Sequence, residues 1–125
     1  MIKTRLFYYL LIFIVCLCGC ENRVMIRIAN RSDVEIQNVV VNFPSQTETY
    51  GNIPSGKTTK YHNVKKAYRY ARIAAVVDGK EALIQPQDYV GESLLSNGKY
   101  TYSLTYNPKA MEKYDRIRLE LENDN

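Results

Sequence analysis

The chain has 125 residues, and its 17 lysines and arginines against 13 aspartates and glutamates give a formal net charge of +4. Lys3 and Arg5 supply two of these charges, so the rest of the chain is close to neutral and gives no reason to expect nucleic-acid binding. The three cysteines stand at positions 16, 18 and 20, so residues 21–125 can form no disulfide and no cysteine metal site. Because His62 is the single histidine, we expect no metal and no cofactor, and we assign no catalytic residue.

The first nineteen residues have the order of a helical signal peptide. Lys3 and Arg5 precede an apolar stretch over residues 6–17, and the small residue Gly19 follows it. Twelve helical residues reach about 18 Å, well short of the roughly 30 Å hydrocarbon core of a bilayer. A cleaved signal peptide is therefore favoured over a permanent transmembrane anchor.

The segment Leu17-Cys18-Gly19-Cys20 resembles the lipobox of bacterial lipoprotein precursors. The resemblance implies cleavage before Cys20, a diacylglyceryl group on its thiol and a further acyl chain on its amine, and two or more chains anchor stably. Glu21, rather than Asp, implies sorting to the outer membrane of a Gram-negative bacterium. We expect a signal peptide over 1–19, a lipidated N-terminus and short tether over 20–23, and a folded domain over 24–125. An ordinary secretory peptide and a short anchor remain the alternatives.

Two strands with a change of face are expected first in the folded domain. Val24, Ile26 and Ile28 share one face of the first strand, and turn formers follow over 30–33. The next apolar run begins on one phase and continues on the other after Gln37-Asn38. This switch predicts a β-bulge or a strand that crosses between sheets.

A loop and a hairpin follow. Residues 51–56 carry two glycines and a proline, which predicts a loop between edge strands over 47–50 and 57–64. Asp78-Gly79 predicts a type I′ turn joining strands over 68–77 and 80–85. The turn sets the register, so that Ile73, Ala75, Ala82 and Ile84 share the apolar face.

This register places Tyr68, Tyr70 and Arg72 together on the opposite face of the hairpin. An exposed stripe of this kind suits contact with a protein or a sugar, so these three residues are the candidate binding site. The alternative is a second buried face or a bulge. Cations also cluster in this third of the chain, either as a solvated face that protects edge strands or as a contact for an anionic surface; they are Lys57, Lys60, Lys65, Lys66, Arg69 and Arg72.

Two more strands complete the domain. A turn at Asn97-Gly98 leads into an alternating strand over 100–106, and a last strand follows over 116–121 after a possible helical turn at 109–113. Seven or eight short strands predict an all-β, antiparallel two-sheet β-sandwich. Residues 95–102 (LSNGKYTY) resemble the start of a late strand in fibronectin type III, immunoglobulin-like and transthyretin-like domains. The resemblance implies that the Tyr100 side chain contacts upstream backbone.

The patterns YGNIPSGKTTKY over 50–61 and PQDYVGE over 86–92 resemble small outer-membrane lipoproteins of unassigned function, which implies no activity. Our leading hypothesis is a non-catalytic envelope module, bound to the membrane through Cys20, that recognises another envelope protein through a sheet edge or the Tyr68, Tyr70 and Arg72 face. The second hypothesis is a glycan-binding module that uses exposed tyrosines. The third is a small hydrolase with Asp88 and Glu92 as acid and base.

Overall fold

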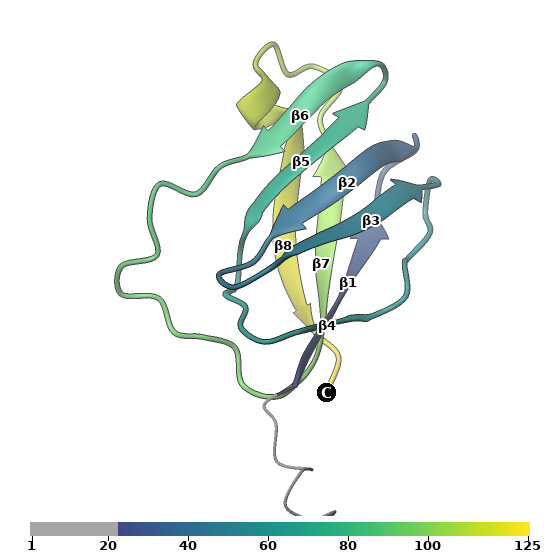
Figure 1. Ribbon diagram of the computed structural model, residues 1–125. Coiled ribbons are helices and arrows are strands. Elements are labelled where there is room, and N and C mark those ends of the chain that lie inside the picture. The colour runs from purple at the N-terminus through teal and green to yellow at the C-terminus, as the bar shows by residue number, and fades with distance from the viewer. Residues whose placement is uncertain (1–22) are drawn as a thin grey trace, which may run out of the picture.

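The computed structural model describes residues 23–125, so the expected signal peptide and Cys20 lie outside the described residues (Figure 1). The described chain is all-β apart from one short 3-10 helix, η1. Its elements are β1 (Val24–Asn30), β2 (Ile36–Asn42), β3 (Thr47–Ile53), β4 (His62–Val64), β5 (Arg72–Val77), β6 (Lys80–Ile84), β7 (Gly98–Tyr106), η1 (Lys113–Asp115) and β8 (Ile117–Asn123). Among residues 23–125, no helix has the length and apolar composition needed to cross a bilayer.

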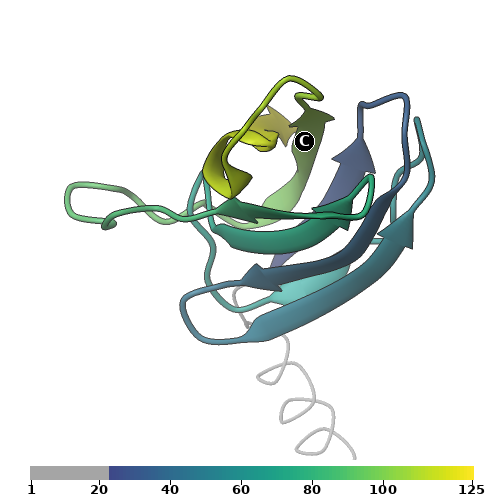
Figure 2. The ribbon, with the colours of Figure 1, turned by 90° about the horizontal axis from the view of Figure 1, so that it is seen from above.

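The eight strands form two four-stranded sheets packed face to face, so the predicted β-sandwich is confirmed (Figure 2). The strand orders are β4-β1-β7-β8 in one sheet and β3-β2-β5-β6 in the other. Every pairing is antiparallel except that of β1 with β7, which run side by side in parallel. The first strand of the domain therefore lies inside its sheet, between β4 and β7.

The core lies between the two sheets and consists of the apolar side chains at alternate positions of the strands. Ile26 and Ile28 of β1 and Ile73 of β5 are fully buried, as the alternation predicts. Tyr102 of β7 is fully buried as well, and its hydroxyl donates to the Tyr68 carbonyl oxygen at 2.5 Å. Removal from water raises the pKa of Tyr102, so this phenol stays a neutral donor.

The hairpin of β5 and β6 has the predicted turn and register. Asp78 and Gly79 have φ angles of 53° and 72°, and Ile73 pairs with Ile84. However, β5 begins at Arg72, so the strand expected over 68–77 is too long by four residues. The main chain bends at Arg69, and the carbonyl of Ala67 accepts the N–H of Leu95 instead of extending the sheet.

The predicted change of face in β2 is a bulge. The pairing of β2 with β5 shifts register between Gln37 and Val40, and Asn38 has a φ of 52°. The Asn38 N–H is satisfied by the side chain of Asn52, at 2.9 Å. Asn52 lies in β3, which extends to Ile53, so residues 51–53 belong to a strand and not to the expected loop. Both β3 and β4 are end strands, as predicted.

Two side chains fix loops to the sheets. Asn30 is fully buried, and its amide donates to the carbonyls of Val34 and Ile53 while its oxygen accepts from Ser32 N–H. The Tyr100 hydroxyl donates to the Ser96 carbonyl, four residues upstream, at 2.9 Å. This is the backbone contact implied by the resemblance of residues 95–102 to late strands of other sandwiches.

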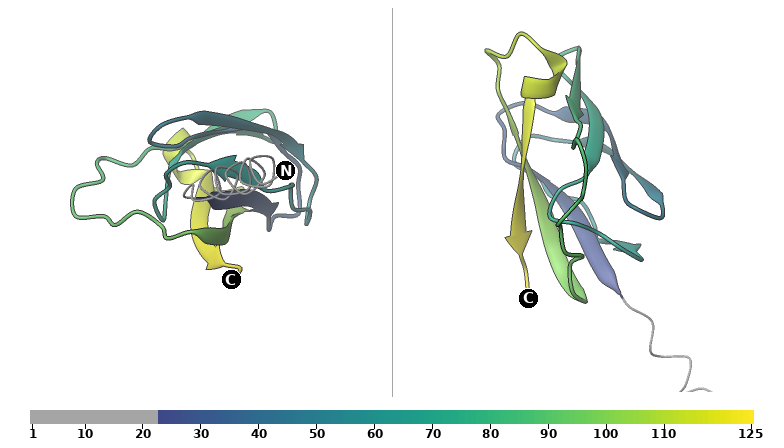
Figure 3. Two further views of the ribbon diagram at one scale, coloured as in Figure 1. Left: turned by 60° about the horizontal axis from the view of Figure 1, so that its bottom comes forward. Right: turned by 90° about the vertical axis from the view of Figure 1, so that its left-hand side faces the viewer.

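The two lateral sides of the sandwich differ. On one side, side chains connect the end strands β3 and β4 of the two sheets. The ring of Tyr50 stacks on that of His62 with centroids 4.0 Å apart, and His62 Nδ1 lies 3.2 Å from Glu48 Oε1. Burial first, and then the Glu48 charge, raise the pKa of Tyr50, whose hydroxyl donates to the Ile26 carbonyl. On the other side, the end strands β6 and β8 meet near η1, and a long loop over 86–97 extends outward before returning to β7 (Figure 3).

Candidate functional site

A concave surface lies on this second side, beside the end strands β6 and β8. It consists of three adjacent hollows of about 410, 590 and 450 Å³ that share Tyr70, and we call it the Tyr70 groove. Its lining combines aromatic and aliphatic side chains with a similar number of polar and charged ones. The lining includes Arg69, Tyr70, Ile84, Gln85, Gln87, Asp88, Glu92, Tyr114, Ile117, Arg118, Leu119, Glu120 and Leu121.

Tyr70 is held in the groove by the loop over 86–97. Its ring stacks on Tyr89 of that loop, with centroids 5.5 Å apart, and Tyr68 stacks on Tyr89 at 4.6 Å. The Tyr70 hydroxyl lies 3.4 Å from the Asp88 carbonyl oxygen. Loss of hydration first, and then the negative charge of Glu92, raise the pKa of Tyr70. Tyr70 is therefore a neutral hydrogen-bond donor at neutral pH.

The main chain of β8 presents unpaired groups along the groove. The N–H of Asn107 bonds to the carbonyl of Arg116, and the N–H of Asp124 bonds to the carbonyl of Lys99. In an antiparallel pair such bonds recur at every second residue, so the even-numbered residues of β8 bond to β7. The N–H and C=O groups of Leu119 and Leu121 therefore point away from β7, because β8 is the end strand of its sheet. The side chains of the same two residues pack against the core.

Tyr68, Tyr70 and Arg72 do not form the exposed stripe that the sequence predicted. All three residues are half-buried, and Arg72 donates from Nε to Gln85 Oε1 at 2.9 Å. The bend at Arg69 places both tyrosines before β5, where the loop over 86–97 covers them through Tyr89. Tyr70 keeps its place in a candidate site, whereas the rings of Tyr68 and Tyr89 mainly hold the loop.

Two components of the groove, Tyr114 and the edge of β8, were missed by the sequence analysis, and so was Tyr89, which holds Tyr70 in place. The signal for β8 was present in the alternation of Ile117, Leu119 and Leu121. Periodicity predicts that these leucines share one face of a strand, but it does not predict that the strand lies at the end of its sheet. No comparable signal marks Tyr89, since its position depends on the path of a long loop.

The proposed acid and base pair lies in a turn at the margin of the groove. Asp88 Oδ1 accepts the N–H of Val90 at 3.2 Å, and the N–H of Glu92 donates to the Tyr89 carbonyl. These bonds give Asp88 a role in shaping the loop. In the described part of the chain, no three His, Cys, Asp or Glu side chains gather closely enough to hold a metal ion.

The cations that cluster in sequence separate in space. Lys57 lies at the end of the sandwich where β1 finishes, because its carbonyl accepts the N–H of Asn30. Lys65 and Lys66 lie at the opposite end, directly after Val64, which pairs with Val24 at the start of β1. The sequence cluster is therefore dispersed, since Lys57 lies at one end of the molecule, Lys65 and Lys66 lie at the other, and Arg69 lines the Tyr70 groove.

Comparison with known proteins gives information about the fold alone. No protein-family model matches the chain, and the search of curated proteins finds no match. A solved NMR structure of a protein from Eubacterium rectale is similar, with a TM-score of 0.55 and 11% sequence identity. The similarity covers 85% of this chain and 92% of that chain, so it extends over most of the sandwich.

Proposed function

We propose that the protein is a lipid-anchored, non-catalytic binding module of the cell envelope. In this proposal Cys20 carries the lipid, in the outer membrane of a Gram-negative bacterium, and the domain holds an extended segment of another envelope protein in the Tyr70 groove. The lipobox-like sequence before Cys20 supports the anchor, and the residue Glu21 supports the location.

The observation that carries the binding role is the position of the groove beside the end strand β8. An extended peptide that adds to a sheet edge gains main-chain hydrogen bonds, and pockets for alternate side chains give it specificity. The outward N–H and C=O groups of Leu119 and Leu121 supply the first requirement. The hollows around Tyr70 and Tyr114 supply the second.

The charges along β8 restrict which strands can pair with its edge. Arg118 and Glu120 are exposed on the strand, and charged residues at an edge discourage pairing with arbitrary strands. Arg69 and Glu92 add one charge of each sign at the other margin of the groove. The partner segment is therefore expected to be apolar at alternate positions and to carry charges of both signs.

Site-specific photocrosslinking in living cells tests this proposal. A photoreactive amino acid at Gln87, which lines the groove, should give a discrete crosslinked species, whereas the same probe at the distant Lys57 should not. Tyr70→Ala should reduce the yield several-fold. Tyr61→Ala is the matched control, since Tyr61 is also half-buried but its ring lies under Arg27, with centroid and guanidinium 4.7 Å apart. Equal yields from the two probe positions would contradict the proposal.

A glycan ligand is the second candidate, favoured by Tyr114, which is 54% exposed and lines the groove. Lys113 Nζ lies over the Tyr114 ring at 5.3 Å from its centroid, which leaves the other face for a sugar, whereas the rings of Tyr68 and Tyr70 both stack on Tyr89. A glycan array probed with the mature protein separates the two candidates. Signal that Tyr114→Ala removes would favour the sugar, and silence from folded protein would exclude it.

A further inference from the structure

The N-terminal end of the domain lies only a few residues from the proposed lipid. The chain enters β1 at the end of the sandwich where β4 and the start of β7 also lie (Figure 1). Two residues, Glu21 and Asn22, separate Cys20 from Arg23, and the three Cα–Cα steps of an extended chain span about 10 Å. We call this part of the molecule, built from Arg23, Lys65, Lys66 and residues 94–97, the tether end.

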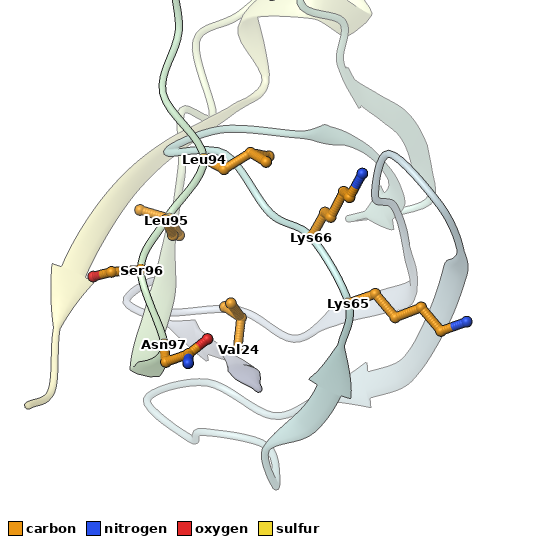
Figure 4. A pocket seen from close by; sticks show the side chains of 7 residues that line it. All are labelled: Val24, Lys65, Lys66, Leu94, Leu95, Ser96 and Asn97. Carbon is orange, nitrogen blue, oxygen red and sulfur yellow. The ribbon is translucent and has the colours of Figure 1, made fainter. Parts of the chain in front are cut away.

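The tether end combines exposed cations with an exposed leucine around a hollow of about 310 Å³ (Figure 4). Lys65 and Lys66 are exposed on one wall of this hollow, and Leu94 is 46% exposed on the other. Figure 4 shows Leu94 directed toward the hollow and the Lys65 side chain directed away from it. Arg23, at the foot of β1, adds a third exposed cation.

Hydrogen bonds hold the two walls to each other and to the turn between β2 and β3. The N–H of Leu95 donates to the Ala67 carbonyl at 2.8 Å, and the N–H of Lys65 donates to Gln46 Oε1 at 2.9 Å. The N–H of Arg23 donates to Asn97 Oδ1 at 3.1 Å, which connects the tether to the same loop. The cations and Leu94 therefore keep a fixed arrangement relative to the tether.

The opposing charges at this end are few. Asp124 lies opposite Lys99, but its charge is already paired, because its Oδ2 lies 3.6 Å from Arg27 Nε and also accepts from the Thr101 and Tyr61 hydroxyls. Glu21, in the tether itself, offsets one cation. Lys65 and Lys66, which line the same hollow as Leu94, form no ion pair within the described residues, so the surface there is positively charged.

We infer that the tether end lies on the membrane, with Arg23, Lys65 and Lys66 against anionic phospholipid headgroups and Leu94 in the interface. The inference rests on the proposed acylation of Cys20. A lipid only about 10 Å from Arg23 keeps the cations within roughly one Debye length of the surface, where a negative surface potential attracts lysine and arginine. The anchor would then orient the domain as well as hold it.

A fluorescent reporter of lipid contact tests the inference on the mature lipidated protein. The folded domain has no other thiol, so Ser93→Cys, next to Leu94, gives a single labelling site. Lys109→Cys, after the far end of β7, is the control position. Quenching by a headgroup-labelled lipid is compared in vesicles of phosphatidylcholine alone and of phosphatidylcholine mixed with phosphatidylglycerol.

Quenching at position 93 should rise at least about twofold with phosphatidylglycerol, and the rise should fall when salt shortens the Debye length from about 10 Å to about 3 Å. Lys65→Glu with Lys66→Glu should remove the rise. Lys57→Glu with Lys80→Glu, the same change of charge at the opposite end, should leave it intact. Melting temperatures of the variants verify that each is folded.

Three results would overturn the inference. Quenching at position 93 that is independent of phosphatidylglycerol would exclude a headgroup contact, and so would equal quenching at position 109. In both cases flotation with every vesicle would show that the anchor itself is sound. Failure to float even with phosphatidylcholine would instead contradict acylation of Cys20 and remove the premise of the inference.

Discussion

At the scale of single residues, buried polar side chains determine how the loops attach to the sheets. Asn30 satisfies the carbonyls of Val34 and Ile53 and so joins the first turn to the end of β3. From sequence, Asn30 is only a turn former, because its local pattern predicts the turn but not the partner 23 residues away. Tyr100 was predictable, since its contact is four residues upstream and belongs to a short motif.

Replacing Asn30 by alanine leaves two buried carbonyls without their donor. We expect the free energy of unfolding to fall by roughly 2–3 kcal/mol, because a buried polar group that loses its partner retains its desolvation cost. Urea denaturation measures the change. Asn63→Ala, at an exposed position in β4, is the matched control and should change stability by less than about 0.5 kcal/mol. Equal losses in the two variants would contradict the role of Asn30.

Asp124 makes stability depend on pH in the acid range. Partial burial alone would raise its pKa, but hydrogen bonds from Thr101 and Tyr61 and the nearby charge of Arg27 outweigh burial and lower the pKa below the ordinary 3.8. A carboxylate with a lowered folded-state pKa stabilises the fold above its unfolded value, and this contribution disappears as pH falls through the folded-state value.

The variant Asp124→Asn should therefore be less stable at neutral pH, by under about 1 kcal/mol after solvent screening. The difference from the native protein should be fully present above about pH 5 and should disappear as the pH falls below the ordinary carboxylate value of 3.8. Urea denaturation across this range measures both quantities. A difference that stays constant with pH would show that the carboxylate charge plays no part.

At the scale of elements, the sequence predicts what local chemistry determines. The hairpin register follows from Asp78-Gly79, and the bulge follows from the change of phase at Gln37-Asn38. The parallel pairing of β1 with β7 could not be predicted, because it joins Val24 to Gly98 and leaves no trace in the periodicity of either strand. The sequence also predicted too early a start for β5. Residues 68–71 are not part of the sheet, because the Tyr68 carbonyl bonds to the Tyr102 hydroxyl and the Tyr70 hydroxyl lies beside the Asp88 carbonyl in the loop over 86–97.

The hairpin turn provides an element-scale prediction. Gly79 has a φ of 72°, and a Cβ atom there meets nothing within 4 Å, so substitution affects backbone conformation alone. Gly79→Val should lower stability by about 1 kcal/mol or more, because a β-branched residue is strained at positive φ. Gly79→Asn should cost clearly less, because asparagine tolerates this region. Thermal melting of both variants decides, and identical losses would contradict a purely conformational cause.

The opposite faces of the hairpin region give a second element-scale prediction. Ile73 is fully buried, so Ile73→Ala should destabilise the domain by roughly 2–5 kcal/mol. Tyr70 is half-buried and stacked on Tyr89, so Tyr70→Ala should cost only about 0.5–1.5 kcal/mol while reducing partner crosslinking. A larger thermal shift from Tyr70→Ala than from Ile73→Ala would place Tyr70 in the core rather than in a binding groove.

At the scale of the whole molecule, the tether end and the Tyr70 groove lie on different parts of the sandwich. Cys20→Ser removes the thiol that would accept the lipid in the proposed anchor, so we expect the precursor to stay uncleaved by the lipoprotein peptidase and to carry no fatty acid. Metabolic labelling with a tagged fatty acid measures the loss. Cys18→Ser is the matched control and should still be labelled. Label that persists on the Cys20 variant would contradict the proposed anchor.

The parallel pairing of β1 with β7 has a mechanical consequence. Tension between the membrane and a segment bound along β8 would pass from the tether through β1, β7 and β8, which are neighbours in one sheet. Pulling on the start of β1 along its length loads the β1–β7 ladder in shear over seven paired residues, so these bonds must break together rather than one after another. β4 adds a second ladder on the other side of β1. The sheet that carries both the tether and the proposed binding edge is thus built to bear force between them.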